Sequence, residues 1–285
     1  MISIFAKEAF LNTDPHQPYK KENYHGNGHL QRVSSMIRGN QIAEALGAKF
    51  NPKDGYKKDI CIYVKPHIKK GNVTFDFEKK SYLDIIDGHN LAEVAKNYPE
   101  VGVIVCSQAD HKIMSKELSN KIVLIPQHHC NFERVNRNSH QVKKVGVIGV
   151  DKAFDFLPKD LEPRLKKEDI ELVKFSKFFE RQDIIDFYMN IDVQIVWRPY
   201  KKILSNPLKI VNAASFGIPT IALSEPAFLE VGGAYIGVED IDELLIMISS
   251  MKLNPYFYQM YSEDCLKIAE NYHIDNISKL YKELL

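Results

Sequence analysis

The stretch RPYKKILSNPLKIVNAASFGIPTIALSEPAFLE, residues 198–230, decides the fold. It follows an apolar run with the length and β-branched content of a buried strand. Ser205 and Pro207 are typical of a helix start, because serine caps free N–H groups and a first-turn proline loses no hydrogen bond. Gly217 is typical of a helix end, and residues 218–223 indicate a second buried strand. The stretch therefore predicts a strand, a loop, a helix and a further strand.

The loop before this helix is cationic. It contains Arg198, Lys201 and Lys202, and Lys209 follows in the first helical turn. A helix N-terminus with free N–H groups beside such cations suits a phosphate group. A solvated basic loop gives the same pattern, so these residues alone leave both interpretations open.

The segment NPLKIVNAASFGIPTIAL, residues 206–223, resembles the donor-binding segment of GT-B glycosyltransferases. In many of these proteins a helix with the pattern K-x-x-E-A-x-A-x-G-x-P-x-I follows the loop that holds the nucleotide-sugar diphosphate. The residues that match in type or position are Lys209, Asn212, Ala213, Gly217, Pro219 and Ile221. Retaining members commonly carry two glutamates, whose places are taken here by Leu204 and Asn212, so both carboxylates are missing.

The resemblance implies a donor-binding set in this chain. Its members are Arg198, Lys202, Ser205, Asn206, Lys209, Asn212, Glu230 and Gly28. The cations and the helix N–H groups near Ser205 would neutralise the leaving diphosphate. Asn212 would hydrogen-bond a ribose hydroxyl, and Glu230 falls where the family often has a glutamate. Neither a divalent metal nor a cofactor is then required.

The rest of the chain alternates between strand-like and helical runs. Strands are expected at residues 1–6, 49–51, 59–65, 82–86, 101–106, 121–125, 144–150, 170–175 and 234–237, with an edge strand over 69–77. Helices are expected at residues 30–46, 91–98, 109–118, 182–190 and 240–251, and over parts of 256–285. This alternation predicts α/β domains with parallel, doubly wound sheets.

The resemblance extends this layout to the GT-B fold, which has two Rossmann-like domains and an interdomain cleft. The implied divisions are an acceptor-side domain over residues 1–135 and a nucleotide-sugar-binding domain over 136–265. A C-terminal helix over 266–285 would cross back to the first domain. The polar, aperiodic run at residues 128–142 is interpreted as the linker.

Candidates for the catalytic base lie in loops of the first domain. Asp87 follows a buried strand, and His25 lies beside Gly26 to Gly28, which resembles a glycine-containing loop of GT-B proteins. Further candidates are Asp14, His16, His29 and His89. A carboxylate or imidazole in hydrogen-bond reach could take the proton of an acceptor hydroxyl. Each of these residues taken alone is also explained as a surface group.

Composition argues against several other classes of protein. The 38 basic and 37 acidic residues give a net charge of +1, which argues against bulk nucleic-acid binding. The cysteines show neither zinc-type nor disulfide-type spacing, and the run His128 to Cys130 lacks a second ligand pair, so no metal site is expected. Scattered reduced thiols fit a cytoplasmic protein.

Membrane attachment is expected to be peripheral if it occurs. The sequence shows neither a signal peptide nor an apolar run of spanning length. Apolar and basic residues in the C-terminal region leave a peripheral membrane contact open, beside the simpler interpretation of a core-packing helix.

These features predict a glycosyltransferase, of the hexosyltransferase type, that moves a sugar from a nucleotide-diphosphate sugar to a hydroxyl acceptor. The acceptor would be a glycan, a lipid or another saccharide. One alternative is a non-catalytic nucleotide-sugar-binding or interaction protein of the same fold, which the two missing glutamates favour. The other is a nucleotide-sugar epimerase, which should need more carboxylates around the donor.

Overall fold

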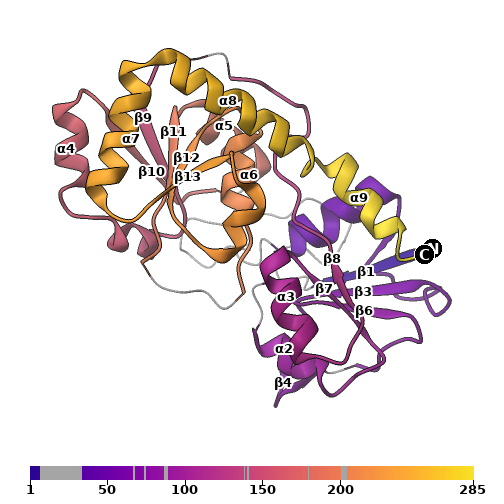
Figure 1. Cartoon of the computed structure of the whole chain (residues 1–285). Coiled ribbons are helices and arrows are strands. Elements are labelled where there is room, and N and C mark those ends of the chain that lie inside the picture. The colour runs from indigo at the N-terminus through magenta and orange to yellow at the C-terminus, as the bar shows by residue number, and fades with distance from the viewer. Residues whose placement is uncertain are drawn as a thin grey trace.

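The apolar runs pair into two all-parallel sheets, each covered by helices (Figure 1). This is a computed structural model, and it describes residues 1–6, 34–66, 68–73, 75–86, 89–137, 139, 141–178, 180–199 and 204–285. The α/β fold with doubly wound parallel sheets, expected from the alternating pattern, is confirmed.

The first sheet has six parallel strands. In spatial order they are β2 (Lys49–Phe50), β1 (Ile2–Ala6), β3 (Ile60–Val64), β6 (Ser81–Asp84), β7 (Gly102–Val105) and β8 (Ile122–Leu124). Strands β3, β6 and β7 are buried along their whole length, which explains why they read as unbroken apolar runs in the sequence.

The prediction of an edge strand over residues 69–77 is wrong. Strands β4 (Ile68–Lys69) and β5 (Asn72–Val73) instead form an antiparallel hairpin separate from the large sheet. Its two turn residues, Lys70 and Gly71, both have positive φ, at 52° and 83°. Such a turn folds the run back on itself, so it cannot extend along the sheet edge.

The helices of this domain follow their strands. They are the π-helical segment η2 (Ser35–Asn40), α1 (Gln41–Leu46), α2 (His89–Ala95) and α3 (Gln108–Glu117). The helix expected over residues 30–46 therefore begins, in its described part, with a π-helical segment. It ends at Gly47, whose φ of 61° is left-handed and favours glycine. Ser107 caps α3 as expected, since its Oγ accepts a hydrogen bond from Asp110 N.

The second sheet has five parallel strands. In spatial order they are β10 (Glu171–Phe175), β9 (Lys144–Ile148), β11 (Val193–Val196), β12 (Thr220–Leu223) and β13 (Tyr235–Val238). Its helical segments are η3 (Asp151–Phe156), α4 (Leu161–Lys167), α5 (Arg181–Met189), α6 (Leu208–Ala214), η4 (Pro226–Val231), α7 (Ile241–Leu253) and α8 (Pro255–Glu270). The strand order reverses between β9 and β11, which is the switch point where folds of this kind bind ligands.

Helix α6 starts later than predicted, and it ends at Ala214, just before the predicted stop at Gly217. Its N-cap is Pro207, so the prediction that Ser205 caps it is wrong. Asn206 provides the side-chain contact instead, because its Oδ1 accepts a hydrogen bond from Leu208 N at 3.1 Å. Gly217 follows the helix with a φ of 70°, and a Cβ there would lie 2.6 Å from Ser262 Oγ. Both the backbone angle and the close contact therefore favour glycine.

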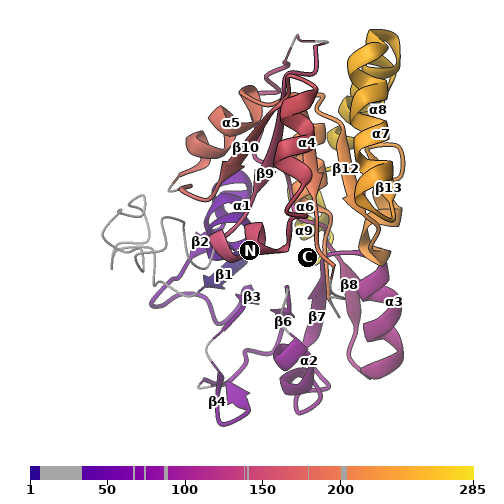
Figure 2. The ribbon, with the colours of Figure 1, turned by 90° about the vertical axis from the view of Figure 1, so that its left-hand side faces the viewer.

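The C-terminal helix α9 (Ile274–Lys282) belongs to the core of the first domain. Its Ile274, Ile277 and Tyr281 are buried in the cluster that contains Ile2 and Ile4. The chain crosses between the domains at residues 271–273, and α9 brings the C-terminus beside the N-terminus (Figures 1 and 2).

The run expected to be a linker lies beside this second crossing. Its described residues between 126 and 143 have no regular structure, yet Gln127, His128, His129 and Asn131 are buried. His129 N donates to Tyr272 O at 3.0 Å, so the two crossings are hydrogen-bonded to each other. The polar residues at the start of this segment are thus buried, and His128 and Asn131 bond backbone groups, whereas residues 133–136 are exposed.

Candidate functional site

Lys209 lies at the switch point of the second sheet. From the first turn of α6 its Nζ donates a hydrogen bond to Ile148 O, at the carboxyl end of β9, at 2.6 Å. Gly149 follows, and a Cβ there would lie 3.3 Å from Lys209 Nζ and 3.1 Å from the Ala153 Cβ. Glycine thus keeps the backbone accessible beside a cation at the edge where open α/β sheets bind ligands.

A buried polar network holds Lys209 in place. Gln194 on β11 is fully buried, and its Nε2 donates to Lys209 O at 2.9 Å and to Thr220 Oγ1 at 2.9 Å. The Gln194 Oε1 accepts from the Tyr188 hydroxyl at 2.8 Å. Because an unpaired buried polar group is costly, this network fixes how α6 sits on the sheet.

Arg198 is bound to a carboxylate of its own chain. Its Nη2 donates to Glu225 Oε2 at 2.7 Å, and its Nε lies 2.6 Å from Glu225 Oε1. Ser205 Oγ donates to the same Glu225 Oε2 at 2.7 Å. The Arg198 side chain is only 16% exposed. The structure therefore brings two predicted donor residues together around Glu225, a partner that the sequence analysis missed although it lies in the deciding stretch.

Ser205 and Glu230 join the two domains. Ser205 N donates to Asp110 Oδ1 of α3 at 3.2 Å. Glu230 Oε2 accepts from Gln108 N, the first residue of α3, at 2.6 Å, and its Oε1 accepts from the Tyr272 hydroxyl at 3.3 Å. Burial raises the pKa of the Glu230 carboxyl above its ordinary value. The carboxyl edges of the two sheets thus meet through α3, the loop before α6, and η4.

Asn212 binds the interdomain linker. The Asn212 Oδ1 accepts a hydrogen bond from Cys130 N of the linker at 2.9 Å. In turn, Asn131 Nδ2 of the linker donates to Ser215 O, at the end of α6, at 2.8 Å. Only 8% of Asn212 is exposed. Its carboxamide, predicted to bind a ribose hydroxyl, therefore already has a structural partner in the linker.

Four predicted site residues lie outside the described residues. They are Gly28 and Lys202 of the donor set and the base candidates His25 and Asp87. The further candidates Asp14, His16 and His29 are outside as well, and only the backbone of His89 is described, at the start of α2.

A buried ion pair in the first domain was missed by the sequence analysis. Arg38 Nε lies 2.5 Å from Asp84 Oδ2, and the two side chains are 1% and 0% exposed. Arg38 Nη1 donates to Pro126 O at 3.1 Å, and Ile86 N donates to Asp84 Oδ1 at 3.2 Å. Burial raises the pKa of the Asp84 carboxyl, and Arg38 opposes that rise. The pair fixes the end of β6, three residues before Asp87. The feature of the sequence that could have revealed this pair is Asp84, an acidic residue at the end of an apolar run.

Three buried histidines surround the double crossing between the domains. The His129 and His273 ring centroids are 5.3 Å apart, and His273 Nε2 lies 3.0 Å from Phe132 O. His128 Nε2 lies 2.9 Å from Ile37 O. Burial lowers the pKa of His128 to about 4 and that of His129 to about 3. Among the described residues no group of three His, Cys, Asp or Glu side chains could hold a metal ion.

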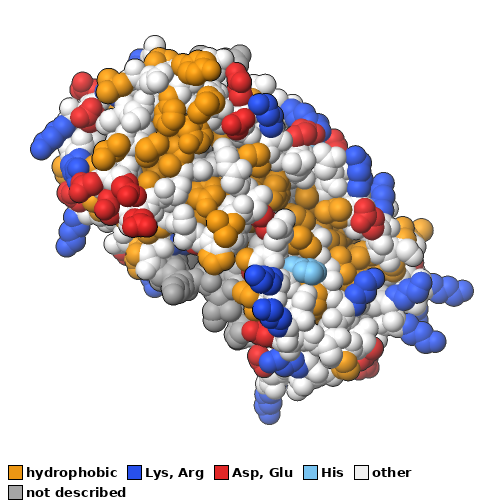
Figure 3. Space-filling view, in the orientation of Figure 1, with side chains coloured by type: hydrophobic (Ala, Val, Ile, Leu, Met, Phe, Trp, Pro, Cys, Tyr) orange, Lys and Arg blue, Asp and Glu red, His pale blue; other side chains and the backbone are white. Residues whose placement is uncertain are grey.

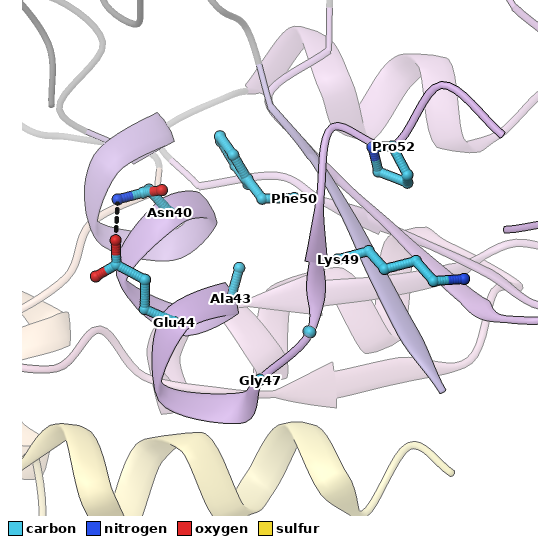
Figure 4. Close-up of a pocket in the computed structure, with 8 residues that line it drawn as sticks. Asn40, Ala43, Glu44, Gly47, Lys49, Phe50 and Pro52 are labelled. Carbon is cyan, nitrogen blue, oxygen red and sulfur yellow. Dashed lines mark hydrogen bonds between the residues drawn. The ribbon is translucent and has the colours of Figure 1, made fainter. Parts of the chain in front are cut away.

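A groove of about 510 Å³ opens between α1 and β2, at the opposite edge of the first sheet from α3 (Figure 4). Its lining residues are Asn40, Ala43, Glu44, Gly47, Ala48, Lys49, Phe50 and Pro52. Asn40 Nδ2 donates to Glu44 Oε1 at 3.0 Å, and Lys49 Nζ lies 2.9 Å from Asp59 Oδ2. Its polar groups thus bond to other protein groups, and it contains none of the predicted site residues.

Several solved structures resemble the fold of this chain. Neither a family model nor a curated protein sequence matches this chain. The crystal structure of TarM matches with a TM-score of 0.61 at 16% sequence identity, over 80% of this chain and 55% of that one. Anabaena Alr3699/HepE in complex with UDP matches with a TM-score of 0.53 at 13% identity, over 71% of each chain. A chain of the Glycosylation Associate Protein (Gap123) complex from Streptococcus agalactiae matches with a TM-score of 0.56 at 14% identity, over 81% of this chain and 55% of that one.

These likenesses show that the chain has the GT-B fold, as the sequence resemblance implied. The chain spans little more than half the length of the TarM and Gap123 chains that it matches.

Proposed function

We propose that this chain binds a nucleotide-diphosphate sugar and transfers its sugar to a hydroxyl acceptor. The observation that carries the proposal is Lys209, whose ammonium group lies at the switch point of a GT-B fold beside Gly149. HepE, a protein of the same fold, has been captured with UDP and with UDP and glucose. The cation supports a diphosphate leaving group on the second domain, and the HepE complexes support uridine as its nucleoside and a hexose as the sugar.

The chemistry requires positive charge beside the leaving diphosphate. Negative charge grows on the β-phosphate as the glycosidic bond breaks, and a fixed cation lowers the energy of that state. Lys209 is held by Ile148 O and by the Gln194 network, so little reorganisation is needed when the charge develops. Arg198 contributes by holding Ser205 and the loop before α6 through Glu225.

A non-catalytic interaction protein of the same fold is the second candidate. Four predicted donor residues have hydrogen-bond partners within the chain, namely Arg198, Ser205, Asn212 and Glu230. The contacts of Ser205 and Glu230 join the two domains. Structural neighbours include a chain of the Gap123 complex and a chain from the structure of accessory secretory protein 1, 2 and 3 in Streptococcus pneumoniae. A protein of this kind would show no turnover of any nucleotide sugar.

The test is a thermal-shift panel of UDP, GDP, ADP and CDP, followed by a UDP-release assay with UDP-sugars. We expect UDP at about a hundred times its dissociation constant to raise the melting temperature by a few degrees, corresponding to about 2.7 kcal/mol. Lys209→Met should remove most of that shift, whereas Lys267→Met, at a 72% exposed position on α8, should keep it. A UDP shift without UDP release from any UDP-sugar would favour the non-catalytic candidate. No shift with any nucleotide would refute the donor site.

A further inference from the structure

Exposed apolar side chains gather where α7 ends and α8 begins. Leu253 is 83% exposed and Tyr256 is 76% exposed. Ile246 lies two helical turns before Leu253, and Met260 one turn after Tyr256, and both are exposed as well. This corner is at the end of the second domain that lies farthest from the first domain (Figure 1), and hydrophobic side chains gather in patches over the part of that domain where α7 lies (Figure 3).

The corner lies at the amino edge of the second sheet, on the side opposite Lys209. The Tyr258 hydroxyl donates to Asp192 O, just before β11, at 2.8 Å. Lys252 Nζ donates to Glu168 O, at the end of α4. These contacts place the ends of α4 and α7, the start of α8 and the start of β11 on one surface, which we call the amino-edge surface.

Lysines are in excess on the amino-edge surface. Its cations are Arg137, Lys143, Lys144, Lys166, Lys167 and Lys252, and its carboxylates are Glu168, Asp169, Glu171 and Asp192. Asp192 is buried and paired with Arg137, and Glu171 lies 3.9 Å from Lys144. Lys143, Lys166 and Lys167 are exposed near the apolar corner, and so are Glu168 and Asp169. The six cations and four carboxylates of this surface leave an excess of two positive charges. An acidic segment, Glu239 to Glu243, lies at the other end of α7, so the positive charge is local to this surface.

The chemistry of the corner favours one occupant. A stable protein partner requires about 800 Å² of surface on each side, whereas the headgroup region of a bilayer can be entered by the four exposed apolar side chains of this corner. Leucine, tyrosine and methionine beside lysines are typical of surfaces that enter the headgroup region of a bilayer. No described helix is long and apolar enough to cross a membrane.

We propose that the amino-edge surface docks on an anionic lipid bilayer. Leu253 and Tyr256 enter the headgroup region, and Lys143, Lys166 and Lys167 lie against lipid phosphates. The carboxyl edge with Lys209 then faces away from the bilayer. The proposal therefore holds or fails independently of the proposed glycosyl transfer.

The test is co-sedimentation of the full chain with vesicles, either of phosphatidylcholine alone or with one third phosphatidylglycerol. We expect binding to the anionic vesicles that weakens with added salt. Leu253→Ser/Tyr256→Ser should weaken it roughly tenfold or more, from the transfer energies of these side chains. Lys166→Glu/Lys167→Glu should weaken it by at least roughly fivefold per lysine.

Matched controls come from other exposed positions. Leu229→Ser, at a 73% exposed site on η4, and Lys279→Glu/Lys282→Glu on α9 should bind vesicles as the wild type does. Absence of sedimentation with anionic vesicles would overturn the proposal, and so would equal weakening by the controls. A doubled mass in gel filtration that Leu253→Ser/Tyr256→Ser abolishes, without vesicle binding, would assign the surface to a second copy of the chain instead.

Discussion

At the scale of single residues, the buried pair of Arg38 and Asp84 shows how strongly one partner depends on the other. Both charges have lost their hydration, and Arg38 also holds Pro126 at the start of the linker. Removal of one member of such a pair leaves the other charged and unpaired in the core, which is more costly than removal of both.

We therefore expect Asp84→Asn to lower the free energy of unfolding by about 3–5 kcal/mol. Urea-induced unfolding measures this loss. The double variant Arg38→Met/Asp84→Asn serves as the control and should recover part of it, because the uncompensated charge is gone. A cost below about 1 kcal/mol for the single variant would mean that the pair is not desolvated as the structure indicates.

Residue roles could be predicted from the sequence only where the signal is local. Gly217 was predicted to stop the helix because glycine readily adopts the left-handed backbone conformation that often follows a helix. The partners of Arg198, Asn212 and Glu230 were missed because Glu225, Cys130 and Gln108 lie 27, 82 and 122 residues away. No spacing rule connects positions so far apart. The predicted base residues His25 and Asp87 and the donor residues Lys202 and Gly28 remain predictions.

At the scale of elements, the linker depends on neutral histidines. His128 faces Arg38 and His273, and His129 faces His273, Arg134 and Glu270. Their pKa values in the folded chain, about 4 and about 3, lie below the 6.5 of a free histidine. Between pH 6.5 and about 4 the unfolded chain takes up protons that the folded chain excludes, so stability falls as the pH falls.

We expect each of these histidines to contribute a slope of up to about 1.4 kcal/mol per pH unit in that window. The measurement is the free energy of unfolding in urea at several pH values from 7 to 4, for the wild type and for His128→Gln. The free energy of unfolding of the variant should depend less steeply on pH. The difference between the two slopes is the contribution of His128, because the carboxylates that titrate in the same range are common to both proteins. Parallel curves would show that His128 has the same pKa in the folded and the unfolded chain, which would contradict its burial as a neutral group.

The contact between α3 and η4 is the second feature at this scale. Glu230 accepts the backbone N–H of Gln108, one of the N–H groups that a helix start leaves unpaired. Glu230→Ala should lower stability by about 1–3 kcal/mol and speed hydrogen exchange at the start of α3. Glu230→Gln keeps an acceptor oxygen and should retain most of the protection. Equal exchange rates in the wild type and both variants would exclude this contact in solution.

The buried strands of both sheets could be predicted because apolar runs mark them without reference to distant residues. The hairpin of β4 and β5 could not, since positive φ at Lys70, a residue that rarely adopts it, is imposed by the fold. The start of α6 was misplaced by two residues because Ser205 is held by Glu225 and Asp110.

At the scale of the whole molecule, two domains meet at the carboxyl edges of their sheets and are joined by two neighbouring crossings. Helix α9 completes the core of the first domain with residues from the end of the chain. The resemblance of one segment was enough to predict this GT-B fold, because that segment specifies how a strand, a helix and the next strand follow one another. The same segment does not specify the function, since Leu204 and Asn212 replace the two glutamates of the family pattern.

Calorimetric titration of the full chain with UDP tests the central claim most directly. We predict one site per chain with a dissociation constant between roughly 1 µM and 1 mM, the range of ordinary substrate constants. Lys209→Met should weaken binding at least tenfold, about 1.4 kcal/mol, while Lys267→Met leaves it unchanged. A titration without binding, or equal affinity in the wild type and Lys209→Met, would contradict a nucleotide site at the end of β9.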